Sequence, residues 1–430
     1  MKALKMIFVG PDGYDKTILF SILGLTLYGT LMIGSSSMGQ SVDDFNYLVV
    51  TIIKQICFVI IGFISMNVIA NVFTISFVKS NRLLSLIVVT IISLILCLLF
   101  GPVNGARAWI RLPLGITEIS IQPSEFAKIT TILIIAGYCG DVKKKFHRDC
   151  DLIGRPIGLI VIICLIVHIF QRDFGSMTVI AMISIQCFLI PSNNQIKGLQ
   201  KVIKIGLVLL AFGAMYLFSP YGESMVEKLP FMLDYQKKRM LSAIDPFYDP
   251  YNTGYQLIKG LTSIATGGWF GKGFGNSVNK YTDFPAANTD YILAILIEEL
   301  GFAGFMTLLM LYAVIIIKLF FYALRIRKES SRIILIGTAT YLLIHLSLNI
   351  GGVTGLIPLT GVPLLMISSG GSATISFMVA IGICQAIISS YNRESSVGQE
   401  KANLRKKKRY RIKRKVVFPK SENAKDIMTM

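Results

Sequence analysis

The sequence predicts an all-α polytopic membrane protein with about ten transmembrane helices. Three observations lead to this fold class. Of the 430 residues, 53% are hydrophobic and only 16% are charged, against roughly a quarter in an ordinary soluble domain. Apolar runs follow one another from Thr17 to Tyr391, and the short loops between them alternate in charge. A soluble protein this apolar would expose large sticky patches, which a bilayer covers with lipid.

Ten apolar segments are the predicted spans: 17–37, 54–78, 83–101, 125–140, 155–170, 174–191, 202–218, 289–322, 333–350 and 365–391. Several are shorter than the usual spanning length of about 20 residues, so a tilted or re-entrant segment among 125–218 is an open alternative. The longest carries Asp290, Glu298 and Glu299 near its start. Thr289 is expected to cap this helix, with Asp290 in its first turn and the two glutamates about two turns inside.

Loop charges predict the orientation of the spans. Basic residues lead the chain and fill every even-numbered loop: Lys2 and Lys5, Lys79 and Arg82, Lys143, Lys144, Lys145 and Arg148, Lys197 and Lys201, then Arg325, Arg327, Lys328 and Arg332. Because cytoplasmic loops are enriched in Lys and Arg, both termini are predicted to be cytoplasmic. Residues 1–392 then form one multi-span domain, in which 219–288 is a long external loop between spans 7 and 8.

A basic tail follows at 393–430 and contributes much of the net charge of +19. The favoured interpretation is a solvated cytoplasmic tail that lies against anionic headgroups. A nucleic-acid-binding arm is the weaker alternative, because no grooved, aromatic-bearing fold surrounds the tail. We therefore expect no nucleic-acid partner.

Ionisable residues gather at the predicted external ends of the spans: Arg107, Glu125, Lys128, Arg172, Asp173, Asp290, Glu298 and Glu299. Charges near a bilayer are costly unless they face a partner or a water-filled cavity. One alternative is a set of ion pairs that lock helices together, and Glu125 and Lys128 share a helix face at a spacing of three. The functional interpretation is a polar cavity, with Asp290 at its mouth as a general base.

Two glycine-rich motifs are interpreted as structural and do not predict a ligand site. The run from Gly267 to Gly275 lacks the GxxxxGK[ST] spacing of a phosphate loop and is predicted to be a flexible, bent external segment. Gly370-Gly371-Ser372 opens the last span, where small residues favour close helix packing. The three histidines and seven cysteines are scattered and predict neither a metal cluster nor a disulfide framework.

A series of short motifs, in this order and at these spacings, resembles the SEDS family (shape, elongation, division and sporulation), which includes RodA, FtsW and SpoVE. The motifs are Gly34-Ser35-Ser36-Ser37, Gly105-Ala106-Arg107-Ala108-Trp109-Ile110, Gln122-Pro123-Ser124-Glu125-Phe126-Ala127-Lys128, Gln171-Arg172-Asp173-Phe174-Gly175, Asp245-Pro246-Phe247, Gly254-Tyr255-Gln256, Gly271-Lys272-Gly273, Gly275-Asn276-Ser277, Asn288-Thr289-Asp290-Tyr291-Ile292, Glu298-Glu299-Leu300-Gly301 and Ser368-Ser369-Gly370-Gly371-Ser372. Before Asp290 the chain reads Pro285-Ala286-Ala287-Asn288 where the family usually has Pro-Glu-x-His.

The resemblance implies a ten-span fold in the bacterial cytoplasmic membrane and a peptidoglycan glycosyltransferase that polymerises lipid II on the external face, for cell division or cell-shape growth. It implies that Asp290 is the catalytic base, and that a class B penicillin-binding protein and other divisome or elongasome proteins are partners. The substrate-binding residues it implies are Arg107, Trp109, Gln122, Glu125, Lys128, Gln171, Asp173, Thr289, Glu298, Ser368 and Gly370. Arg107 and Lys128 are the candidates to stabilise a diphosphate leaving group. No organic cofactor is implied, and a divalent cation such as Mg or Mn is an open addition.

Two other functions stay open at this stage. A lipid II flippase would need polar groups along a path through the bilayer, whereas the ionisable residues here gather on one face. A non-catalytic scaffold that recruits the penicillin-binding protein would bind its partner without polymerase activity.

Overall fold

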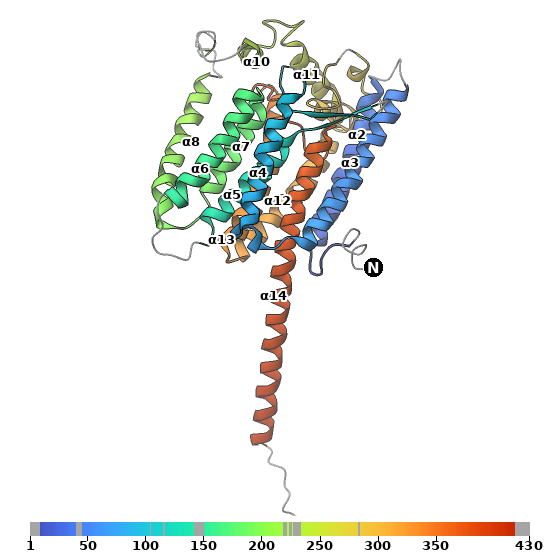
Figure 1. Ribbon diagram of the computed structural model, residues 1–430. Helices are drawn as coiled ribbons and strands as arrows, with labels where there is room; N and C mark the ends of the chain where they lie inside the picture. The colour runs from blue at the N-terminus through green and yellow to red at the C-terminus, as the bar shows by residue number, and fades with distance from the viewer. Residues whose placement is uncertain are drawn as a thin grey trace, which may run out of the picture.

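The computed structural model describes residues 9–39, 45–103, 105–114, 117–141, 150–217, 222, 226, 234–282 and 284–417. Ten helices form a bundle in this part of the chain (Figure 1). They are α2 (Lys16–Met38), α3 (Phe45–Val72), α4 (Asn81–Leu96), α5 (Pro123–Cys139), α6 (Arg155–Leu165), α7 (Phe174–Phe188), α8 (Lys197–Leu217), α12 (Ile292–Arg325), α13 (Glu329–Val353) and α14 (Gly371–Val417). The predicted loop cations at 2, 5, 143–145 and 148 lie outside the described residues.

The bundle confirms the predicted fold class. Within the described ranges, eight helices are long and apolar enough to cross a membrane. Each of the ten helices falls on one of the ten predicted segments, with shifted ends. The segment 54–78 begins earlier, at Phe45, and the segment 365–391 begins later, at Gly371, because residues 354–370 form a loop.

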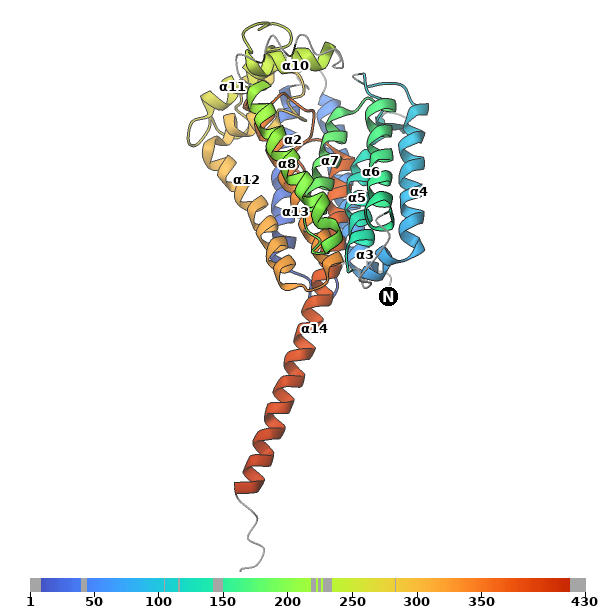
Figure 2. The ribbon, with the colours of Figure 1, turned by 90° about the vertical axis from the view of Figure 1, so that its left-hand side faces the viewer.

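Burial divides the bundle into an interior and a periphery. The spanning windows of α13 and α14 are 78% and 83% buried within the protein, whereas that of α8 is not buried at all. Polar side chains on α13 and α14 therefore meet protein, and those helices can carry a hydrogen-bonded network at membrane depth. Figure 2 shows α8 and α12 on the outside of the bundle.

The chain enters and leaves the bundle at the same end. The Asn392 amide donates to the Gly13 carbonyl over 2.7 Å, and the Asp15 N–H donates to Gln385 Oε1 over 2.9 Å. An even number of spans requires this arrangement. α14 has 47 residues and continues unbroken past residue 393, where the sequence predicted a separate tail, so that it projects from the bundle (Figure 1).

The opposite end carries elements that the sequence interpretation did not predict. α10 (Asp234–Ile244) and α11 (Tyr255–Gly267) lie there, within the predicted long loop (Figure 2). Strands β1 (Ile110–Leu114) and β2 (Thr117–Ile121) form an antiparallel hairpin in which Ile110 pairs with Ile121. The two strands hydrogen-bond to each other along their facing edges, which gives the chain between α4 and α5 a regular structure at this end of the bundle.

α12 contains a break that the glycine-rich segment completes. Gly301 has a φ of 68°, and the helix on either side of it loses backbone partners. Four backbone hydrogen bonds of 2.9–3.0 Å replace them: the N–H groups of residues 272 and 273 donate to the carbonyls of 298 and 299, and those of 302 and 303 donate to the carbonyls of 268 and 269. The segment Gly267–Gly275 is bent, as predicted, with positive φ at Gly268, Gly271, Gly273 and Gly275, and main-chain hydrogen bonds join it to α12.

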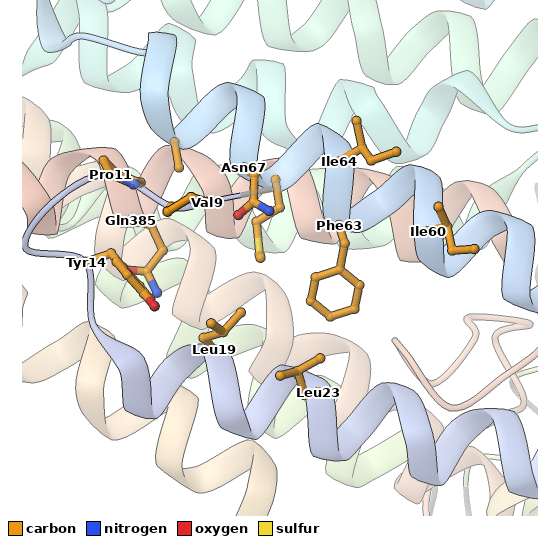
Figure 3. Close-up of a pocket in the computed structure, with 13 residues that line it drawn as sticks. Val9, Pro11, Tyr14, Leu19, Leu23, Ile60, Phe63, Ile64, Asn67 and Gln385 are labelled. Atoms are coloured by element: carbon orange, nitrogen blue, oxygen red, sulfur yellow. The ribbon is translucent and has the colours of Figure 1, made fainter. Parts of the chain in front are cut away.

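A cavity of about 390 Å³ lies at the end of the bundle where α14 leaves it (Figure 3). Its walls come from residues 9–14 and from α2, α3 and α14, with Leu19, Leu23 and Phe63 among the apolar lining residues. Gln385 bonds to both backbone groups of Asp15 over 2.9 Å. This amide has its partners within the chain, and we assign the cavity no chemistry.

Candidate active site

Asp290 lies in a turn that precedes α12. The helix begins at Ile292 and has no side-chain cap. The Thr289 hydroxyl donates instead to the Ala286 carbonyl over 3.3 Å, and the N–H groups of residues 289 and 291 donate to the same carbonyl over 3.1 Å. The expected Thr289 cap is therefore wrong, because the turn takes up its hydroxyl. Asp290 stands outside the helix, at the end of the bundle that carries α10 and α11.

Two neighbouring segments hold the Asp290 turn in place. The buried amide of Asn349 on α13 donates to the Asp290 carbonyl over 3.0 Å and to the Val362 carbonyl over 3.4 Å. The buried hydroxyl of Ser368 donates to the Thr289 carbonyl over 2.7 Å and accepts from the N–H of residue 364 over 2.9 Å. The turn is thus bonded to the loop of residues 354–370, which also contains Gly370.

The Asp290 carboxylate lies beside Gly361 and Arg239. A Cβ placed on Gly361 would lie 3.9 Å from Asp290 Oδ2 and 3.8 Å from Arg239 Nη1. Gly361 has a φ of +70°, which favours glycine and keeps this space open. Arg239 comes from α10 and donates to the Leu359 carbonyl over 3.0 Å. Burial raises the pKa of the Asp290 carboxyl, and the Arg239 charge opposes that rise.

A second polar cluster joins Gln122 to Asp173. The Gln122 amide donates to Asp173 Oδ2 over 2.8 Å, and Asp173 Oδ1 accepts from the Ser176 N–H at the start of α7. The Gln122 N–H donates to Ser372 Oγ on α14 over 3.0 Å. The motifs at 122–128, 171–175 and 368–372 therefore meet at one end of the bundle.

A third cluster is fully buried between α5 and α13. The predicted Glu125–Lys128 pair is confirmed, with 2.6 Å between Oε1 and Nζ. Tyr341 donates to Glu125 Oε2 over 3.0 Å. Lys128 Nζ also lies 3.1 Å from His345 Nε2, and His345 Nδ1 lies 2.9 Å from the Pro363 carbonyl. An ammonium can only donate, so the histidine is neutral and carries its proton on Nδ1.

This buried network bears on the predicted role of Lys128 in stabilising a diphosphate leaving group. Its side chain is 1% exposed and its ammonium has two partners inside the bundle. The structure therefore does not present Lys128 as a free cation for a diphosphate at the surface. Through His345 it instead supports the loop that lies against Asp290.

The remaining predicted substrate-binding residues lie either in the segments before α5 and α7 or beside the glycine-rich segment. Arg107 is exposed and Trp109 is half-buried. The backbone N–H of Arg107 donates to the carbonyl of the buried Gln171 over 2.8 Å. Glu298 is fully buried in the glycine-rich segment, where Lys272 Nζ and Ser277 Oγ bond its two carboxylate oxygens over 2.7 and 2.6 Å. These bonds give Glu298 a structural role within α12.

The arrangement supplies a base and cations around one surface. Asp290 is a carboxylate whose raised pKa keeps it a usable proton acceptor. Arg239 lies near the carboxylate, since both groups fall within 4 Å of a Cβ placed on Gly361, and Arg107 is exposed in the segment between α4 and β1. Guanidinium groups bind phosphate oxygens in a bidentate manner, which suits a phosphorylated ligand.

A protein-built metal centre is not part of this arrangement in the described part of the chain. No group of three or more His, Cys, Asp or Glu side chains there is placed to hold a metal ion. A magnesium ion bound by one or two carboxylates and by substrate phosphates would need only Asp290 from the protein.

Sequence reasoning missed Arg239, Asn349 and His345. Arg239 stands in the basic run Lys237-Lys238-Arg239 of the predicted external loop, which was a usable signal for an anionic ligand. Asn349 and His345 are polar residues four apart in an apolar segment, which places them on one helix face. Polar side chains within a span are costly without partners, so that pair was a signal too.

Comparison with known proteins points to one family over almost the whole chain. The profile of the cell cycle proteins FtsW, RodA and SpoVE matches residues 16–393. The probable peptidoglycan glycosyltransferase FtsW of Francisella salina is 30% identical over 373 residues, covering 86% of this chain and 87% of that protein. Stage V sporulation protein E of Bacillus subtilis (strain 168) is 31% identical over 378 residues, covering 87% and 96%.

Solved structures share the fold. A chain from a study of how a peptidoglycan synthase complex coordinates polymerization and crosslinking superposes with a TM-score of 0.66, at 24% identity, over 87% of this chain and 97% of that one. The rod shape determining protein RodA of Thermus thermophilus superposes with a TM-score of 0.58, at 21% identity, over 87% and 96%.

Proposed function

The chain belongs to the FtsW/RodA/SpoVE family of cell cycle proteins, and from that premise we propose that it is a peptidoglycan glycosyltransferase that polymerises lipid II during division or cell-shape growth. The observation that carries the proposal is the Asp290 turn. It presents a carboxylate of raised pKa next to Arg239, at the end of a membrane bundle where a lipid-linked sugar can reach it.

The proposed reaction is a direct displacement at the anomeric carbon of the donor sugar. Asp290 accepts the proton of the acceptor 4-hydroxyl as that oxygen bonds to the anomeric carbon. The bond from that carbon to the diphosphate oxygen breaks, and the lipid diphosphate leaves with both electrons. Arg239 and Arg107 stabilise the charge that develops on the leaving group. The polyprenyl tail stays in the bilayer while the sugars remain at the end that carries α10 and α11.

The fixed backbone around Asp290 supports this role. Asn349 and Ser368 bond the carbonyls of residues 290 and 289, so the carboxylate starts from a set position before substrate binds. Positioning of this kind lowers the entropic part of the barrier. Gln122 and Asp173 are hydrogen-bonded to each other at the same end of the bundle. We propose that they contact the sugar or the peptide of lipid II.

The proposed setting is the bacterial cytoplasmic membrane, with both termini in the cytoplasm. The basic even-numbered loops support this orientation. The proposed partner is a class B penicillin-binding protein that crosslinks the strands, together with other divisome or elongasome proteins. A similar fold occurs in a peptidoglycan synthase complex that couples polymerization to crosslinking, which supports such a pairing. Asp290 would be the protein ligand of a divalent cation such as Mg or Mn, which would supply positive charge for the diphosphate leaving group.

The test is polymerisation of labelled lipid II by the purified protein with its penicillin-binding partner, whose transpeptidase is blocked by a β-lactam. Wild type is expected to make long glycan strands and Asp290→Asn none, because the amide cannot accept the proton. Assays with and without EDTA test whether polymerisation requires a divalent cation. Intact complexes that make no strands with either protein would refute the enzyme and favour a flippase or a scaffold.

A further inference from the structure

Large aromatic side chains are exposed on the segment that completes the α12 break. Trp269 is 70% exposed, Phe270 84% and Phe274 49%. We call residues 268–274 the aromatic loop. Exposed aromatic side chains in a row are unusual on a surface that faces water. Their position on a membrane protein therefore requires an explanation.

The aromatic loop is held rigidly. Its backbone makes the four hydrogen bonds across the Gly301 break. The Trp269 ring also packs on the edge of the Phe302 ring, with centroids 5.2 Å apart and planes at 85°. A Cβ on Gly271 would lie 2.1 Å from the Glu299 carbonyl, which shows how closely the loop meets the helix. The aromatic side chains therefore point outward from a fixed base.

The loop continues the lipid-facing surface of α12. Exposed apolar side chains recur along one face of this helix at helical spacing: Phe302, Met306, Met310, Ile317, Phe321 and Leu324. In a chain that crosses the membrane, such a face meets lipid tails. Because Trp269 packs on Phe302, the loop lies directly above the end of this face.

Helix length places the loop at a definite depth. Arg325 ends α12 and is followed by Arg327 and Lys328, which mark one membrane boundary. The hydrocarbon core is about 30 Å thick, which corresponds to about 20 helical residues at about 1.5 Å each. Counting back from Leu324, the opposite boundary falls near Phe305. Trp269 beside Phe302 then lies in the headgroup region, where Trp is enriched.

We propose that the aromatic loop is a membrane-interface anchor, in which Trp269 and Phe270 insert into the headgroup boundary of the leaflet on the α10 and α11 side. The occupant of this surface is bilayer lipid. The anchor fixes the height of the outer part of α12, and with it the turn that precedes this helix, relative to the membrane surface.

The chain offers a direct test, because Trp109 and Trp269 are its only two tryptophans. Trp109→Phe leaves Trp269 as the sole tryptophan in the full-length protein, so that excitation at the red edge of the absorption band selects it over the tyrosines. This variant is reconstituted in phosphatidylcholine vesicles whose acyl chains carry bromine near the headgroup or near the methyl end. Trp109→Tyr provides a second route to the same single-tryptophan protein if the first substitution impairs folding. Trp269→Phe reports the Trp109 signal for comparison.

For an interfacial anchor, bromine near the headgroup is expected to lower the Trp269 emission about twofold more than bromine near the methyl end, and lipid is expected to shield Trp269 from acrylamide. Phe270→Ser in the same background is expected to weaken the lipid quenching. Strong quenching by acrylamide with none by either brominated lipid would overturn the proposal, since the loop would then face water or a soluble partner. Stronger quenching by the deep bromine would also overturn it.

Discussion

Replacing Lys280 by methionine is expected to destabilise the protein strongly. The Lys280 ammonium bonds Glu299 Oε1 over 2.8 Å, the Gly275 carbonyl over 2.7 Å and the Ser35 hydroxyl over 2.9 Å. Both side chains of the ion pair are 0% exposed. Removing one partner of a buried pair leaves an uncompensated charge and typically costs about 3–5 kcal/mol.

The expected cost lies at the lower end of that range. Glu299 keeps neutral donors after the substitution, namely the Ser35 hydroxyl at 2.6 Å and the Gly275 N–H at 3.0 Å. We therefore expect a loss of about 3 kcal/mol, and a fall in Tm of roughly 3–6 °C for a chain of this length, measured by thermal unfolding in detergent. The added substitution Glu299→Gln is expected to recover most of the loss, because it removes the unpaired charge.

Lys272→Met, at the neighbouring ion pair with Glu298, is a matched control. Lys272→Met breaks the pair with Glu298, but the Lys272 side chain is 31% exposed and the carboxylate keeps the Ser277 hydroxyl and the Asn279 amide as donors. Its cost is expected to be about 1–2 kcal/mol. Equal Tm values for Lys280→Met and wild type, or a double variant no better than Lys280→Met, would refute the argument that an unpaired Glu299 charge sets the loss.

Three further predictions concern the site and the loop. Asn349→Leu is expected to lower lipid II polymerisation about tenfold, since it frees the Asp290 backbone. Assays at a temperature well below the Tm of the variant separate loss of positioning from unfolding. Burial raises the pKa of Asp290, so the acid limb of the pH–rate profile is expected above the ordinary carboxyl pKa of 3.8. Activity falls as the pH drops through the raised pKa, because the protonated carboxyl cannot accept a proton. Arg239→Leu is expected to move this limb to higher pH, since the Arg239 charge opposes the rise. Gly271→Ala is expected to lower Tm, because its Cβ would meet α12 backbone at 2.1 Å and its φ is +75°, whereas Gly158→Ala, with open space around it, is the control.

The spans could be predicted because hydropathy over about 20 residues is a strong, local signal. The ends of the spans are predicted less well. The sequence predicts a span from residue 365, yet Leu365 and Ile367 are buried in a loop and the helix starts at Gly371. Burial inside protein and burial in lipid select the same residue types, so sequence alone does not separate a buried loop from a span.

The sequence predicts which motifs contribute residues to the site, but it does not predict how those residues contact one another. The chain pairs Gln122 with Asp173 and bonds Ser368 to Thr289, but those contacts join residues more than 50 positions apart. Arg239 reaches Asp290 only because α10 docks over the loop at Gly361. No local pattern encodes such docking. Whether the predicted residues bind substrate stays a prediction.

The way α12 is completed has a consequence for how this protein tolerates sequence change. The four hydrogen bonds that cross the Gly301 break join backbone atoms only. Most side chains of the aromatic loop can therefore be exchanged during evolution without altering the path of the chain. The constraint falls on the glycines, since an added Cβ at Gly267, Gly271 or Gly301 would lie within 2.4 Å of backbone atoms. We expect relatives that keep this fold to keep these glycines, while the exposed positions of the aromatic loop other than Trp269 and Phe270 vary more freely.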